Sequence, residues 1–160
     1  MKTSRKYLYL IPALAFLGCK PETQKEEIAK PTESKKEIVE IKIPENVDND
    51  FKVFLDYFSK DSIFQVSRVT FPLKVMEVDE NNTIESIEKT ISKTEYTMLD
   101  FEYPKDALTR EYDKYTQKIK TNGNKTVIEI RGYDNGICTD FFFEKLNGKW
   151  FLKSWNDTSD

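Results

Sequence analysis

The chain has 160 residues, a formal charge of −3, two cysteines and no histidine. Without histidine, the Ser-His-Asp and Cys-His arrangements of nucleophilic catalysis are excluded, and so is a zinc site built from cysteine and histidine ligands within one chain. The chain is also acidic overall and lacks the clustered Lys and Arg residues that nucleic acid binding requires. We therefore predict no metal, no cofactor and no nucleic-acid partner, and we assign no catalytic residue.

The first 18 residues have the composition of an export signal. Three basic residues precede an apolar run from residue 7 to residue 18, which as a helix spans about 18 Å and is too short for a bilayer core of roughly 30 Å. Two cleavage sites compete: residues 13–15 (ALA) have the small-x-small form that releases a soluble protein, whereas residues 17–19 (LGC) resemble the bacterial lipobox. The abruptly polar residues after Cys19 favour the lipobox. We predict a signal peptide at 1–18, lipidation of Cys19, and anchoring to the cell membrane or outer membrane on the exported side.

Residues 19–43 are predicted to be a flexible tether. From residue 20 onwards the segment holds six Lys and six Glu and almost no aromatic residues, so it buries too little apolar surface to offset the entropy of ordering. A flexible chain of this length reaches about 27 Å. Because the tether is neutral, removal of residues 1–18 leaves a formal charge of −6 that belongs entirely to residues 44–160.

Residues 44–160 hold 18 of the 21 aromatic residues and are predicted to form one domain. A helical apolar spacing predicts a first helix that starts near Asp48, and a second short helix begins at Asp61 and ends before Pro72. A short strand follows at residues 73–78. The isoleucines after the turn at residues 79–82 predict a third helix. The apolar positions of the first and third helices are Phe51, Phe54, Leu55 and Phe58, and Ile84, Ile87 and Ile91.

The C-terminal half changes to the period of β-strands. Asn-Gly pairs at residues 122–123 and 147–148 predict two hairpins, which a turn at residues 134–136 joins into a four-strand meander. The expected partners are Ile119 with Thr126, Gln117 with Ile128, Tyr115 with Ile130, Phe143 with Leu152, Phe141 with Ser154 and Lys145 with Trp150. Helices followed along the chain by antiparallel strands predict an α+β domain, in which N-terminal helices pack on a curved, four- to five-stranded antiparallel sheet.

Three motifs carry a family resemblance that covers roughly residues 48–157. They are FKVFLDYFSKDSIFQVSRVTFPL at residues 51–73, ISKTEYTMLDF at 91–101, and FFFEKLNGKWFLKSWND at 141–157. The chain resembles an uncharacterised lipoprotein family of Bacteroidetes, the domain of unknown function 4348, although Tyr96 stands where the family pattern has Trp. This resemblance implies a nuclear transport factor 2-like fold, a cup of cystatin-like shape, and a location in the cell envelope. It implies no activity.

Five residues are candidates for binding a ligand. Gln65 and Arg68 share one face of the second helix, where Arg68 either presents its guanidinium to an anion or pairs with a carboxylate; the structural role is favoured. Gln117 and Thr139 are polar positions on otherwise apolar strand faces, where they line a pocket with Tyr115 and Phe141 or lie at a sheet margin.

Two functions from different classes remain open. The leading one is a non-catalytic, membrane-tethered accessory domain that binds a small molecule or an envelope protein. The alternative is a small enzyme of the isomerase or dehydratase kind, in which a tyrosine and an aspartate act without histidine. Tyr103, Tyr112, Asp100 and Asp113 supply those residue types.

Two further expectations concern the strands of the second hairpin. Phe142, Phe151 and Trp155 are predicted on one mixed sheet face, which is a candidate surface for a homodimer. Cys138 is predicted on the same, wetter face as an inert small residue, because nearby acids disfavour a reactive thiolate.

Overall fold

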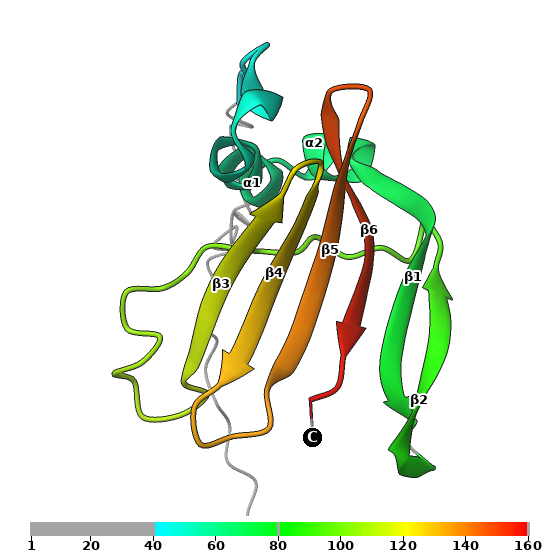
Figure 1. Ribbon diagram of the computed structural model, residues 1–160, viewed down its shortest axis with the longest axis vertical. Helices are drawn as coiled ribbons and strands as arrows, with labels where there is room; N and C mark the ends of the chain where they lie inside the picture. The colour runs from blue at the N-terminus through cyan, green and yellow to red at the C-terminus, as the bar shows by residue number, and fades with distance from the viewer. Residues whose placement is uncertain (1–40, 80, 160) are drawn as a thin grey trace, which may run out of the picture. The chain divides into compact units, whose positions relative to one another are not determined.

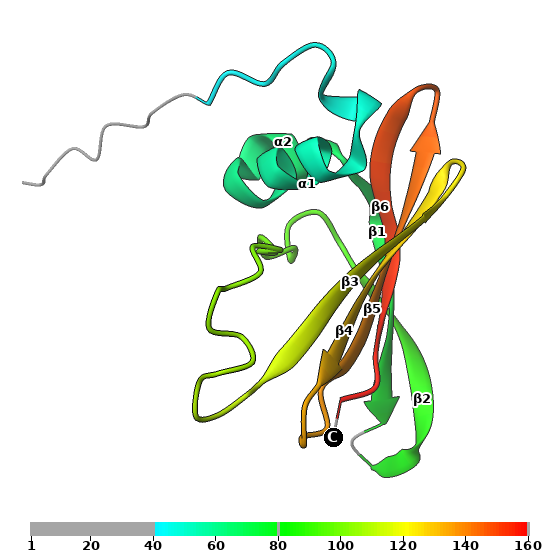
Figure 2. The ribbon, with the colours of Figure 1, turned by 60° about the vertical axis from the view of Figure 1, so that its left-hand side comes forward.

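The structure is a computed structural model that describes residues 41–79 and 81–159 (Figures 1 and 2). The predicted signal peptide, Cys19 and residues 20–40 lie outside the described residues. No helix among the described residues has the length and apolarity needed to cross a membrane. Ile43, at the end of the predicted tether, packs against the core.

The helices form where the apolar spacing predicted them, with sharper boundaries. A 3₁₀ turn, η1 (Val47–Asn49), precedes α1 (Phe51–Lys60), and α2 (Ser62–Ser67) follows after one residue. The Asp50 carboxylate accepts hydrogen bonds from the first turn of α1, and the Asp61 carboxylate accepts one from the Phe64 N–H of α2 at 2.8 Å. Helix α1 buries the four predicted positions: Phe51, Phe54, Leu55 and Phe58.

Six strands form one sheet in the order β2-β1-β6-β5-β4-β3. Their bounds are β1 (Val69–Asp79), β2 (Asn82–Ile91), β3 (Tyr115–Asn122), β4 (Lys125–Gly132), β5 (Cys138–Leu146) and β6 (Lys149–Asp157). Strands β1 and β6 pair in parallel, with Val75 opposite Trp155, and the other neighbours are antiparallel. The α+β class is therefore confirmed, but the sheet has six strands and is mixed.

The predicted third helix is wrong, because residues 82–91 form strand β2. Isoleucines three and four residues apart fit one helix face, but half of the ten residues are β-branched and favour a pleated surface. Asn82 pairs with Asp79, and from there the chain runs antiparallel to β1, so that Ile91 lies opposite Leu73. The hairpin supplies the hydrogen-bond partners that decide the conformation.

The first predicted hairpin forms with a register that differs from the expected one. Asn122 pairs with Lys125, so Gly123 occupies the first central position of the turn at φ +59°. Ile119 consequently faces Ile128, two residues further along β4 than predicted. A shift of two residues keeps each side chain on its expected face of the sheet.

The second hairpin closes at residues 147–148 as predicted, and Phe143 lies opposite Leu152. A β-bulge between Phe142 and Phe143 then shifts the pairing, so that Phe141 faces Trp155 and not Ser154. The shift turns Trp155 to the same face as Phe141, with ring centroids 5.8 Å apart. The placement of Trp155 with Phe142 and Phe151 on one sheet face is therefore wrong.

The sheet bends around a core of aromatic side chains. Both helices and the long segment between β2 and β3 lie on the same, concave side of the sheet (Figure 2). Phe51, Phe54 and Phe58 of α1 pack against Phe143 with ring centroids 5.2–6.0 Å apart. These contacts fix the helices over one end of the concave face and leave its other end to the long segment.

Candidate ligand-binding site

Residues 92–114, here called the crossing segment, connect β2 to β3 across the concave face (Figures 1 and 2). The Gln65 amide holds the segment at Leu99, where its Nε2 donates to the Leu99 carbonyl and its Oε1 accepts from the Leu99 N–H, both at 2.7 Å. The Phe101 N–H donates to Ser59 Oγ at 3.1 Å, and Gln117 Nε2 donates to the Phe101 carbonyl at 2.9 Å. Side chains of α1, α2 and β3 thus position the segment through its backbone.

Phe101 fills the middle of the concave face. Its side chain is 4% exposed, and its ring lies 4.9–5.9 Å from the rings of Phe58, Phe141 and Phe143. The predicted cup therefore has an aromatic centre, with one depression on the helix side of Phe101 and another on the side of the loops. We call them the helix-side cleft and the loop-side hollow.

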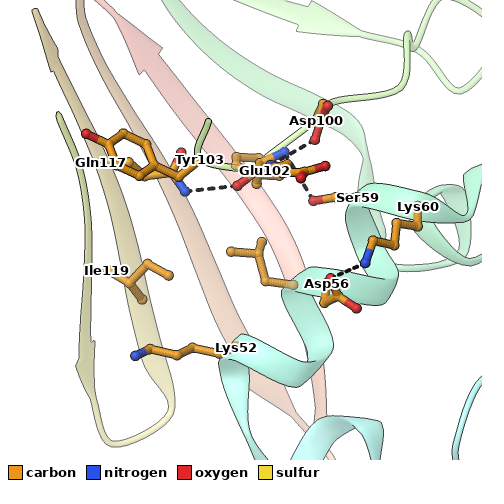
Figure 3. Close-up of a pocket in the computed structure, with 11 residues that line it drawn as sticks. Lys52, Asp56, Ser59, Lys60, Asp100, Glu102, Tyr103, Gln117 and Ile119 are labelled. Atoms are coloured by element: carbon orange, nitrogen blue, oxygen red, sulfur yellow. Dashed lines mark hydrogen bonds and ion pairs between the residues drawn. The ribbon is translucent and has the colours of Figure 1, made fainter. Parts of the chain in front are cut away.

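The helix-side cleft has a volume of about 480 Å³ and mixed polarity (Figure 3). It lies between α1, the crossing segment and β3, and its polar lining consists of Lys52, Asp56, Ser59, Lys60, Asp100, Glu102, Tyr103 and Gln117. Most of these groups already have partners. Asp56 pairs with Lys60 and raises the pKa of that ammonium group, and the Asp100 carboxylate accepts from the Glu102 N–H.

The loop-side hollow has a volume of about 370 Å³ and a mainly apolar lining. Its walls come from the crossing segment and from strands β3 to β6. The apolar and aromatic lining residues are Leu99, Tyr115, Ile130, Ile137, Phe141 and Trp155; the polar ones are Arg110, Thr139 and Asp157. An apolar concavity with a few polar groups is the usual form of a small-molecule site.

Arg110 is held in a fixed position at this hollow. Its Nε donates to the Asp113 carbonyl at 3.1 Å, Nη2 donates to the same oxygen, and the guanidinium carbon lies 5.0 Å from the centroid of the Tyr115 ring. Burial raises the pKa of the Tyr115 phenol, and the neighbouring Arg110 charge acts in the opposite direction. Asp157 accepts from Thr139 Oγ1 at 3.2 Å and from the Ser159 N–H at 3.1 Å.

The structure separates the five predicted ligand-binding residues. Tyr115 and Thr139 line the loop-side hollow together with Phe141, which is one of the two alternatives that the strand pattern left open, whereas Gln117 lines the helix-side cleft. Gln65 is fully buried, and all of its hydrogen bonds go to the protein: to the carbonyls of Phe58 and Leu99, the Leu99 N–H and the Tyr96 hydroxyl. Gln65 lines neither depression.

Arg68 also lies away from both depressions. Its two terminal nitrogens each donate to one oxygen of Asp48 at 2.9 Å, and both side chains are 11% exposed. The backbone N–H of Trp150 donates to the same carboxylate at 2.8 Å. This geometry is the carboxylate pairing that was one of the two alternatives for Arg68, and it ties η1 to the end of α2 and the start of β6.

Sequence reasoning named Tyr115, Thr139 and Phe141 for a pocket but missed the other six lining residues of the hollow, among them Arg110, Trp155 and Asp157. Arg110 lies in a loop without any periodicity, and nothing in its neighbourhood marked it. Trp155 was assigned to the opposite face because a bulge has no clear sequence signal. Asp157 reaches the hollow for the same reason, since the bulge sets the facing of the whole end of β6.

Of the tyrosines and acids proposed for an enzyme, Tyr103 and Asp100 both line the helix-side cleft, but no hydrogen bond joins these two side chains. The Tyr103 hydroxyl donates to the Tyr115 carbonyl at 3.0 Å, and Tyr112 is 72% exposed. Among the described residues, no tyrosine hydroxyl is hydrogen-bonded to a carboxylate. Nor do the described His, Cys, Asp and Glu side chains form a group of three with metal-binding geometry. Cys138 is a half-buried free thiol.

Comparison with known sequences identifies a family. A sequence model of the family described as "Domain of unknown function (DUF4348)" matches residues 33–157. The three motifs at residues 51–73, 91–101 and 141–157 lie within this match, so the family expected from them is confirmed. A search of curated proteins gives no significant match.

Comparison with solved structures supports the fold. An NTF2-like protein of Bacteroides fragilis aligns with a TM-score of 0.54 and 24% identity over 75% of this chain, which spans half of that protein's length. A protein of Bacteroides uniformis aligns with a TM-score of 0.51 and 26% identity over 66% of this chain and 74% of its own. The fold is therefore of the NTF2-like kind.

Proposed function

The chain belongs to the DUF4348 family, and on that premise we propose that it is a lipid-anchored domain of the cell envelope that binds a small molecule without transforming it. The loop-side hollow carries this proposal. Its volume of about 370 Å³ lies in the range of small-molecule pockets, and its lining combines aromatic walls with three polar side chains. A ligand of one to three rings fits such a space.

The arrangement of the polar groups favours binding over catalysis. Around the two depressions, the Tyr103 hydroxyl donates a hydrogen bond to a backbone carbonyl. The Asp157 carboxylate accepts hydrogen bonds from the Thr139 hydroxyl and the Ser159 N–H. The isomerase-like alternative needs a tyrosine hydroxyl and a carboxylate that are free to act on one substrate. Tyr103 and Asp100 both line the helix-side cleft, but the Tyr103 hydroxyl already donates to the Tyr115 carbonyl and the Asp100 carboxylate accepts from the Glu102 N–H.

Binding in the hollow is tested with a neutral fluorescent probe, N-phenyl-1-naphthylamine. The protein used is the full chain carrying Cys19→Ala, which removes the predicted site of lipid attachment, so that no bilayer is needed and none competes for the probe. We expect saturable binding of about one probe per chain. Ile130→Trp, which fills the hollow from β4, is expected to weaken binding at least about tenfold.

Val127→Trp is the matched control for this experiment. Val127 lies on the same strand as Ile130, three residues away and therefore on the opposite face of the sheet. We expect this variant to bind the probe as the parent does. Equal binding by the Ile130→Trp variant, or equal loss in both variants, would show that the hollow is not the binding site.

The predicted lipid anchor at Cys19 is tested separately, because its prediction rests on the sequence alone. Cys19→Ala is expected to move the protein from the membrane fraction to the soluble fraction of the producing bacterium, since it removes the acceptor of the lipid. Wild type should incorporate a labelled fatty acid, and the variant should not. A variant that still carries the label, or still sediments with membranes, contradicts lipidation at Cys19.

A further inference from the structure

Arg110 differs from the other arginines that the structure describes. Arg68 pairs with Asp48, and Arg131 pairs with Asp140 at 2.7 Å. Arg110 forms no ion pair with a described carboxylate, although it lies in a strongly acidic domain. An arginine without an acid partner keeps its positive charge available for a ligand.

The guanidinium group of Arg110 is also organised in advance. A guanidinium carries five N–H donors, and the Asp113 carbonyl takes one from Nε and one from Nη2. The guanidinium carbon lies over the Tyr115 ring, 5.0 Å from the ring centroid. Three donors remain in a fixed plane, which suits the oxygens of a carboxylate or sulfonate. A ligand therefore gains these hydrogen bonds without having to order a flexible side chain.

The remaining wall of the hollow is aromatic and nearly uncharged. Phe141 and Trp155 lie side by side with centroids 5.8 Å apart, and Ile130 adds an aliphatic surface. The one acid of the lining, Asp157, is stabilised by the Thr139 hydroxyl and the Ser159 N–H. The hollow thus combines an apolar surface for a flat body with one available cation.

We propose that the loop-side hollow selects aromatic acids, in which a planar apolar body packs against Phe141 and Trp155 and one anionic group binds Arg110. This inference rests on the proposed function, because it names the ligand class of the same hollow. Arg110 acts in it as the residue that determines specificity. Asp157 opposes the anion weakly, so its neutralisation strengthens binding.

The test compares two probes that differ by a single charged group. 1-Anilinonaphthalene-8-sulfonate and N-phenyl-1-naphthylamine share the anilinonaphthalene body, and only the first carries a sulfonate. We expect the full chain with Cys19→Ala to bind the sulfonate about tenfold more tightly than the neutral probe. Arg110→Gln should remove this preference, because it weakens the binding of the sulfonate about tenfold more than the binding of the neutral probe.

Three further variants separate specific from general effects. Lys52→Gln removes one positive charge from the helix-side cleft and should change neither affinity. Asp157→Asn should tighten sulfonate binding about two- to threefold, opposite in sign to Arg110→Gln. Arg110→Lys keeps the charge but loses the planar donors, and should retain part of the preference.

Each outcome bears on one of the two proposals. If both probes bind the parent chain equally, the selection of an anion is wrong while binding in the hollow stands. If Arg110→Gln weakens both probes equally, Arg110 only shapes the hollow, and the proposed specificity is again wrong. If neither probe binds the parent chain, the proposed function itself fails.

Discussion

The polar side chains at the two ends of the concave face differ in how completely they are paired within the protein. Under the helices, Arg68, Asp48 and Gln65 are buried, and their polar groups find partners within the protein. At the loop end, Arg110 is half-buried and has hydrogen bonds to one backbone carbonyl, and no acid in the described part of the chain pairs with it. A polar residue with complete pairing holds the fold together, and one with spare donors is available for a ligand. This contrast is why Arg110, and not Arg68, is the candidate for recognition.

Asp48→Ala should have the largest effect of any change that tests this contrast. It leaves the Arg68 guanidinium buried without its acid and the Trp150 N–H without its acceptor. We expect a loss of about 3–5 kcal/mol in the free energy of unfolding, measured by urea denaturation. The double variant with Arg68→Met should lose less than Asp48→Ala alone, because the uncompensated charge is gone. A single variant within about 1 kcal/mol of the parent would contradict a structural role for the pair.

Gln65→Leu should come next in size. The substitution nearly preserves volume but leaves the carbonyls of Phe58 and Leu99 and the Leu99 N–H without their partners. We expect a loss of about 2–3 kcal/mol, together with faster hydrogen exchange of the Leu99 amide. Gln117→Leu is the comparison, since it removes one bond to the crossing segment from a half-buried position and should cost about 1 kcal/mol. Equal losses in the two variants would contradict the special role of Gln65.

Tyr96 should give the protein an alkaline instability of intermediate size. Burial raises the pKa of the Tyr96 phenol, whose hydroxyl donates to Gln65 Oε1 at 2.7 Å. An unfolded phenol titrates near pH 10, so above that pH the unfolded chain releases a proton that the folded chain retains. Stability from this group is complete below pH 10 and falls above it, by up to about 1.4 kcal/mol per pH unit.

Urea denaturation of Tyr96→Phe at a series of pH values between 8 and 11 measures this contribution. The variant should lose stability with pH less steeply than the parent above pH 10, whatever its stability at pH 8. Tyr112→Phe, at a side chain that is 72% exposed, should have the slope of the parent. A parent and a Tyr96→Phe variant with the same slope would disprove the contribution of Tyr96.

Arg110→Gln should have the smallest effect on stability. It removes a contact with the Tyr115 ring and hydrogen bonds at an accessible position, so the expected loss is about 0.5–1 kcal/mol. The same substitution should change the free energy of sulfonate binding by more than it changes the free energy of unfolding. A loss as large as that of Asp48→Ala would mean that the two ends of the concave face do not differ in the way described.

The local structure of several elements was predictable because short-range physics decides it. The spacing of Phe51, Phe54, Leu55 and Phe58 matches the helical period, and these side chains form the buried face of α1. Asn147 and Gly148 both adopt positive φ, at +48° and +80°, and set the turn of the second hairpin as expected. The positions of Tyr115 and Thr139 on the concave face followed from strand alternation alone.

Other features were beyond local reasoning. The isoleucines of residues 84–91 fit a helix, and only pairing with β1 makes them a strand. The bulge at Phe142 reverses the facing of Trp155, and no residue in the stretch signals it. The path of the crossing segment depends on Gln65, which lies 34 residues before Leu99 in the chain.

For this protein, the sequence by itself determined the family, the α+β class, the buried face of α1 and the residue types available for chemistry. Periodicity, turn residues and composition are local properties, so they are readable without coordinates. The tertiary structure decided the mixed six-stranded sheet, the filling of the cup by Phe101 and the lack of an ion pair between Arg110 and any described carboxylate. Those features depend on contacts between residues far apart in the chain, because burial and pairing are settled only when the whole domain closes around its core.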